Sequence, residues 1–219
     1  MKPIAATIAQ GVWTLALIFG FRAPVSLVQG EITVDYEALE TAVLQETNRL
    51  RSDPQAYAAE LEDSKRYYRG KIYRAPGQTP LRTREGVVAV EDAILYLNHQ
   101  EALGELTRST AMDRAAADQA ADQAQSGKIG HTGSDNSTPS ERLSRYGTWQ
   151  IMAAENISYG PTTGAEVVRQ LVIDDGFLVR GHRIMLLNPV LEKTGVACGP
   201  HPRYSVMCVM TYAGDYEPR

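Results

Sequence analysis

The sequence predicts an α+β fold in which helices flank a small antiparallel sheet. Several segments in the first two thirds of the chain place apolar residues at helical spacing or begin with helix start signals. Near the C-terminus, two β-type segments enclose a turn rich in glycine and proline. The chain has 219 residues, 43% hydrophobic and 22% charged, which suits one sizeable globular domain.

The first predicted helix covers Val34–Arg51, where leucines and valines recur at helical spacing. It ends before Pro54, because the residue before a proline avoids the helical region. Pro54 is itself a favoured first residue for a second, short helix reaching Leu61. The next segment, Arg66–Arg84, is polar and rich in tyrosine, so we expect a long surface loop there.

Three more helices are predicted in the middle of the chain: Gly86–His99, Thr110–Gln125 and Pro139–Tyr146. The third has the clearest start signal, with a threonine N-cap, a proline at the first position and a glutamate at the third. The C-terminal part is expected to contain a strand Ile151–Tyr159, a helix Gly164–Asp175, a short turn or strand His182–Leu187, and hairpin strands Thr194–Cys198 and Tyr204–Tyr212.

The N-terminus, residues 1–30, has the pattern of an export segment. Lys2 supplies the positive charge, and the apolar stretch Gly11–Phe21 fits the ~7–15 residues of a signal-peptide core. Cleavage after Gly30 would change the formal net charge from −4 to −6, because it removes Lys2 and Arg22 and no acid. The alternative is an uncleaved N-terminal anchor. The negative charge argues against general nucleic-acid binding.

Two cysteines, Cys198 and Cys208, both lie in the predicted hairpin. In an exported chain they are compatible with one disulfide, which would contribute about 3 kcal/mol at most in the chain-entropy model. The alternative is a pair of buried free thiols. Metal binding by these cysteines is disfavoured, since neither belongs to a C-x-x-C motif.

Three polar residues in short local motifs are candidates for a functional site. His131 follows Gly130 in a predicted loop, and His182 follows Gly181. Imidazole titrates near neutral pH and is a common metal ligand. Glu155 lies in a strand among apolar residues, where a carboxylate is costly to bury unless it is paired, and the two histidines are obvious partners.

Two acids, Asp174 and Asp175, end a predicted helix and therefore oppose its macrodipole. At least one is expected to have a specific partner, with Arg180 and Arg183 as candidates. The sequence contains no G-x-S-x-G, H-E-x-x-H or phosphate-loop motif. The missing nucleophile motifs favour a binding protein over an enzyme.

These residues together resemble the CAP superfamily, also called SCP domains, which includes cysteine-rich secretory proteins, venom antigen 5 and plant pathogenesis-related proteins. The matching pieces span residues 36–214: Asn48-Arg49 through Arg51 with Pro54 and Tyr57, Gly130-His131, Ala154-Glu155-Asn156-Ile157, Gly181-His182-Arg183 and Met207-Cys208-Val209. Two runs, Ile173–Arg183 and Gly199–Tyr204, are similar to one bacterial and lower-eukaryote branch of this superfamily. The resemblance implies an α-β-α sandwich with a large central cavity.

The resemblance also implies a cavity tetrad of two histidines and two acids: His131, Glu155, His182 and Asp174, with Asp175 as the alternative fourth member. In the family the helix before the second histidine often reads Trp-x-x-Glu, whereas this chain has Leu171-Val-Ile-Asp174. Members have been linked to divalent metals, sterols or fatty acids, and sometimes proteolysis.

The sequence therefore predicts a secreted, periplasmic or extracellular CAP-domain protein. Its cavity is expected to bind Zn²⁺ or another divalent cation through His131 and His182, together with a small apolar or lipid ligand. One alternative is a hydrolase that uses Glu155 or a histidine as general base. The other is a secreted lipid- or sterol-binding protein.

Overall fold

A computed structural model describes residues 34–219, so the predicted export segment lies outside the described residues. The helices are α1 (Tyr36–Ser52), α2 (Pro54–Ser64), the 3₁₀ turn η1 (Lys65–Tyr67), α3 (Val87–His99), α4 (Thr110–Ser126), α5 (Pro139–Tyr146), α6 (Gly164–Ile173) and α7 (Gly181–Leu186). The strands are β1 (Tyr68–Arg69), β2 (Ile72–Tyr73), β3 (Leu81–Arg82), β4 (Thr107–Arg108), β5 (Gly147–Tyr159), β6 (Lys193–His201) and β7 (Ser205–Pro218).

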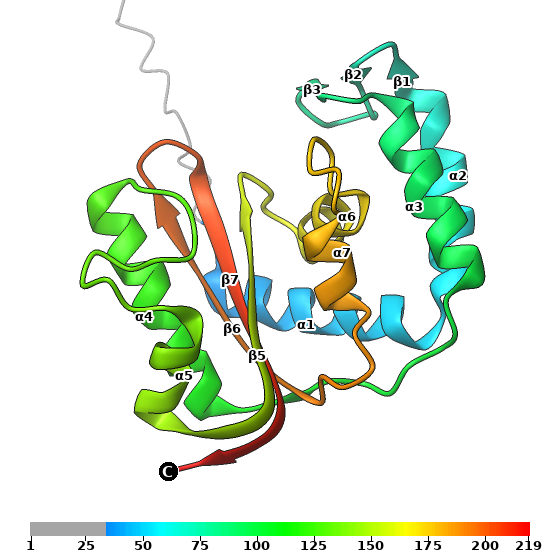
Figure 1. Cartoon of the computed structure of the whole chain (residues 1–219). Coiled ribbons are helices and arrows are strands. Elements are labelled where there is room, and N and C mark those ends of the chain that lie inside the picture. Colours follow the sequence, from blue (N-terminus) through cyan, green and yellow to red (C-terminus); the bar gives the residue numbers. More distant parts are fainter. Residues whose placement is uncertain (1–33) are drawn as a thin grey trace, which may run out of the picture. The chain divides into compact units, whose positions relative to one another are not determined.

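The central sheet has the strand order β4-β6-β7-β5. The three long strands pair antiparallel, and the short edge strand β4 pairs parallel with β6. Helices α4 and α5 cover one face, and α1, α6 and α7 lie on the other, with α2 and α3 packed together beyond them (Figure 1). The predicted α-β-α sandwich is confirmed, with an antiparallel sheet except at its β4 edge.

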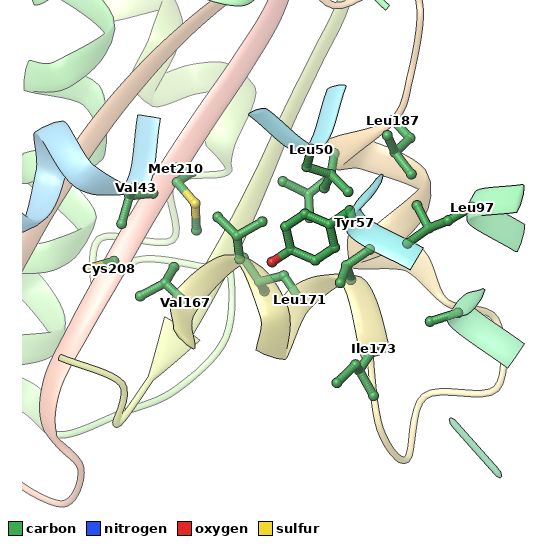
Figure 2. Packing of buried hydrophobic residues seen from close by; sticks show 14 of the residues in the cluster. Val43, Leu50, Tyr57, Leu97, Val167, Leu171, Ile173, Leu187, Cys208 and Met210 are labelled. Atoms are coloured by element: carbon green, nitrogen blue, oxygen red, sulfur yellow. The ribbon is translucent and has the colours of Figure 1, made fainter. Parts of the chain in front are cut away.

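Two hydrophobic layers fill this sandwich. The larger one lies between the sheet and the helices α1, α2, α3 and α6; Figure 2 labels ten of its members: Val43, Leu50, Tyr57, Leu97, Val167, Leu171, Ile173, Leu187, Cys208 and Met210. The other face of the sheet packs against α4 and α5 through residues such as Met112 and Leu143. A Cβ added at Gly195 would collide with the carbonyl carbon of Met112, so glycine lets α4 approach β6 this closely.

The disulfide between Cys198 and Cys208 is present, and the two residues lie directly opposite each other on β6 and β7. A second cross-link is made by Arg51, whose buried guanidinium donates hydrogen bonds to the backbone oxygens of Leu186, Asn188 and Leu191. Arg51, one of the motif residues near the start of the chain, therefore acts in the fold and ties α1 to the end of α7 and the segment after it.

Two of the predicted elements are wrong. The expected loop Arg66–Arg84 contains η1 and the antiparallel strands β1, β2 and β3. This small sheet is anchored by Tyr73, which is buried and accepts a hydrogen bond from Arg169 of α6. The expected turn or strand at residues 182–187 is the helix α7, because the Asp174 carboxylate accepts the His182 N–H and so caps the helix start from outside its own sequence.

Candidate functional site

The first part of the candidate site is a hydrogen-bonded row of three side chains, His131, Glu155 and Arg142, on the α4–α5 face of the sheet. Glu155 lies on β5 with a fully buried side chain. Its Oε1 is 2.9 Å from His131 Nδ1, and its Oε2 accepts a hydrogen bond from Arg142 Nη2 at 2.7 Å. Because an ionised carboxylate only accepts hydrogen bonds, this contact requires a proton on His131 Nδ1. The imidazole itself is 47% exposed.

The loop that carries His131 is clamped from several sides. Gln119 and Gln123 on α4 both donate to the Gly130 carbonyl oxygen, at 2.9 and 2.6 Å. Gly130 N–H donates to the Tyr159 hydroxyl, and Arg142 donates to the His131 carbonyl oxygen. A surface loop held at this many points presents its imidazole in one orientation.

The second part of the site is the pair formed by Asp174 and His182. Asp174 is the C-cap of α6, in the left-handed region with φ 54°, and its side chain is 1% exposed. Its Oδ1 lies 2.7 Å from His182 Nδ1, and its Oδ2 accepts the His182 backbone N–H at 2.9 Å. The neighbouring Asp175 is occupied elsewhere, since its carboxylate accepts the backbone N–H groups of Arg84 and Glu85. Asp174 is therefore the acid that orients His182.

The two arginines expected to pair with these acids do not bind the acids' carboxylates, although Arg180 Nη1 donates to the Asp174 backbone oxygen at 2.8 Å. Arg183 is buried and donates to the carbonyl oxygens of Val172 and Ile173, the last residues of α6. Arg180 forms a two-point ion pair with Glu85, at 2.7 and 2.8 Å. Together with the Gly176 N–H, Arg180 lowers the pKa of Glu85 to about 2. These contacts fix the segment between α6 and α7.

The two histidine–acid pairs flank the edge strand β5. Glu155 and Asn156 are adjacent on this strand, so their side chains point to opposite faces of the sheet. Glu155 binds His131 on one face, while Asn156 Nδ2 donates to the His182 carbonyl oxygen on the other, at 3.1 Å. A single peptide unit of β5 thus connects the two halves of the predicted tetrad.

In one respect both histidines are arranged like metal ligands. Both Nδ1 atoms face buried carboxylates, which is the arrangement that orients Nε2 toward a metal. Among residues 34–219, no group of three or more His, Cys, Asp or Glu side chains is placed to hold an ion. The fit to a metal therefore rests on two imidazoles, and the acids take the supporting position rather than that of ligands.

The surroundings of His182 are partly apolar. The Phe177 ring meets the imidazole edge to face, with centroids 5.3 Å apart, and is itself 54% exposed. Hollows on the described surface lie along α1 and along α3, and neither is lined by the four tetrad residues. None of the helices between residues 34 and 219 combines the length and apolarity needed to cross a bilayer.

Comparison with known proteins decides the family. The model of the CAP family, described as the cysteine-rich secretory protein family, matches residues 44–212. The chain belongs to the CAP family. The family resemblance inferred from the sequence motifs is thereby confirmed.

Two solved structures that match the chain are only distantly similar to it. An outer surface protein from Borrelia burgdorferi is 20% identical, with a TM-score of 0.44, over 58% of this chain and 90% of that one. An extracellular protein containing an SCP domain from Bacillus anthracis is also 20% identical, with a TM-score of 0.44, over 58% of this chain and 39% of its own length. A search of the curated proteins finds no match.

One member of the site, Arg142, was missed by the sequence analysis. It lies on α5 with a side chain that is 1% exposed, and it supplies the cation that a buried carboxylate requires. The Glu155 carboxylate was expected to need a partner, but the prediction assigned that role to the two histidines. In the CAP domain, both His131 and Arg142 bind the Glu155 carboxylate.

Replacing Arg142 with methionine is expected to lower the free energy of unfolding by about 3 kcal/mol or more, since it leaves the Glu155 charge buried with one partner fewer. Urea unfolding measures the change. The matched control is Arg145→Met on the same helix, where the guanidinium is 41% exposed and pairs with Asp118 and Asp135. This control should cost no more than about 1 kcal/mol. Equal losses in the two variants would contradict the assigned role of Arg142.

Proposed function

We propose that this CAP domain is an exported binding protein whose His131 and His182 bind a divalent cation, Zn²⁺ or a similar ion, through Nε2. The observation that carries the proposal is that each imidazole has Nδ1 against a buried carboxylate, at 2.9 Å for Glu155 and 2.7 Å for Asp174. A carboxylate in this position fixes the ring orientation and raises the basicity of the other nitrogen.

The number of protein ligands determines how tightly such a site would hold its ion. Structural zinc sites use about four protein ligands, and catalytic sites about three with an open position. Two imidazoles leave the remaining positions to water or to a bound ligand. We therefore expect modest affinity for the ion alone and tighter binding when a ligand with an oxygen or nitrogen donor completes the coordination.

Export is the second part of the proposal, and it places the protein in a periplasmic or extracellular setting. It is supported by the pattern of residues 1–30 and by the disulfide Cys198–Cys208, since disulfides persist mainly in oxidising compartments. A small apolar or lipid ligand at the same site is supported by the exposed Phe177 ring beside His182.

Isothermal titration with Zn²⁺ tests the cation proposal. The wild type should give a saturable heat, and the double variant His131→Ala/His182→Ala should lose it. Glu155→Gln should weaken binding by ~10-fold or more, because the orienting carboxylate charge is gone. The control is His99→Ala, which removes an exposed imidazole from the end of α3 and should bind as the wild type does. An unchanged isotherm in the double variant would exclude these histidines as ligands.

A second candidate function is general-base hydrolysis by His131. The favouring observation is that its imidazole is half-exposed while a buried carboxylate holds the ring. Glu155 is a poor general base itself, since its fully buried side chain is shielded from a bound water. In an assay on a peptide or cell-wall library, activity should fall by ~100-fold or more in His131→Ala and persist in His99→Ala. No turnover by the wild type, with or without Zn²⁺, would rule this function out.

A further inference from the structure

The charge of this chain is unevenly distributed along its sequence. Residues 65–84 contain seven basic residues and no acid, whereas the whole chain has a formal net charge of −4. The other 199 residues together therefore carry −11. The basic residues are Lys65, Arg66, Arg69, Lys71, Arg74, Arg82 and Arg84. Such a local excess creates a positive potential on one part of an acidic protein.

Six of these seven cations are exposed and make no ion pair with any residue in the described part of the chain; only Lys65 does, with Glu62 and Glu91. Two neighbouring acids, Glu85 and Asp175, are already engaged. Glu85 is bound by Arg180, and Asp175 by backbone N–H groups. Six positive charges of this segment are thus not neutralised by ion pairs within the described part of the chain.

The three-stranded sheet β1-β2-β3 determines which way two of these cations, Arg69 and Arg82, point. Arg69 pairs with Ile72, and Ile72 with Arg82, so the three residues form one row across the sheet and share a face. The next row contains Tyr73, whose buried ring is contacted by the guanidinium of Arg169. Because neighbouring rows point to opposite faces, the row with Arg69 and Arg82 faces outward.

An exposed apolar loop tip lies beside β1-β2-β3, the basic sheet that carries Arg69 and Arg82. Phe177, Leu178 and Val179 are consecutive and are 54%, 85% and 79% exposed. The tip is joined to the basic segment by contact as well as by position: a Cβ added at Gly176 would collide with Arg84 Cδ, so the Arg84 side chain covers the residue just before the tip. In Figure 1 the segment between α6 and α7 and the β1–β3 sheet occupy the same end of the domain.

We propose that this surface, made of residues 65–84 and the tip Phe177–Val179, docks onto an anionic lipid bilayer. The basic sheet lies against the negatively charged headgroups, and the tip inserts at the boundary between headgroups and acyl chains. Cations near an anionic leaflet and apolar side chains at the interface are the two attractions that hold peripheral proteins on membranes.

The apolar tip decides between a bilayer and a soluble polyanion. A soluble polyanion would use the unpaired arginines and lysines but would gain little from three apolar side chains. A bilayer uses both features at once, because its charged surface covers an apolar interior. Docking in this way would bring the membrane next to His182, which contacts the Phe177 ring. The proposal does not depend on any ion at the histidine pairs.

Vesicle co-sedimentation with the full chain tests the proposal. Vesicles of phosphatidylcholine with phosphatidylglycerol should retain the wild type, more at low than at high ionic strength, and pure phosphatidylcholine should retain much less. Leu178→Asp should lower the partition coefficient by roughly tenfold, and Arg69→Glu/Arg82→Glu by roughly 30-fold or more. All variants carry the same N-terminal segment, so its contribution is common to them.

Two matched controls keep these results specific. Leu95→Asp changes an apolar residue of α3 that is 62% exposed, and Lys128→Glu/Arg203→Glu reverses two cations outside the basic segment. Both should bind vesicles as the wild type does. Equal losses in test and control variants, or no preference for anionic vesicles, would overturn the proposal. Binding that is lost in the arginine variant but unchanged in Leu178→Asp, with the same pattern on heparin, would replace the bilayer with a soluble polyanion.

Discussion

The buried carboxylate of Glu155 is the constraint on which the candidate site depends. A carboxylate with no solvent-exposed side-chain surface is unfavourable unless a cation and hydrogen-bond donors surround it. Arg142 from α5 and His131 from the loop after α4 supply both. Because the two donors come from separate segments, satisfying one charge also fixes the position of α5 and of the His131 loop against β5.

The same physical solution recurs on the other side of β5. Asp174 ends α6, where a negative charge opposes the helix dipole. Its two oxygens accept the ring and backbone N–H groups of His182, while Arg183 binds the carbonyl oxygens at the end of the helix. In both halves a buried acid holds Nδ1 of a histidine. The two buried acids therefore orient both imidazoles.

Much of the fold was predictable because it is specified locally. The start of α5 depends on Thr138 and Glu141, which are three residues apart and form the expected capping box. The disulfide and the long hairpin likewise follow from one short segment. His131, Glu155 and His182 were singled out from their local motifs, and the family resemblance added Asp174. The structure places each histidine against one of the acids.

What could not be predicted depends on partners that lie outside the element concerned. The sheet β1-β2-β3 looked like a loop because its anchor is Arg169, 96 residues from Tyr73. Helix α7 looked like a turn because its N-terminal cap is the side chain of Asp174. Arg142 was overlooked since nothing in the sequence of α5 shows which face meets Glu155. In each case polar contacts with residues outside the element decide the outcome.

The ring nitrogens of the histidines offer the most direct test of this account. In ¹⁵N NMR spectra of the neutral imidazoles, His131 and His182 should both carry the proton on Nδ1 and leave Nε2 bare. His201 provides an internal standard of the opposite kind, because its Nδ1 accepts the backbone N–H groups of Arg203 and Tyr204 and its Nε2 faces the Lys128 carbonyl oxygen. A proton on Nε2 of His131 or of His182 would contradict the claim that the buried carboxylates orient these rings.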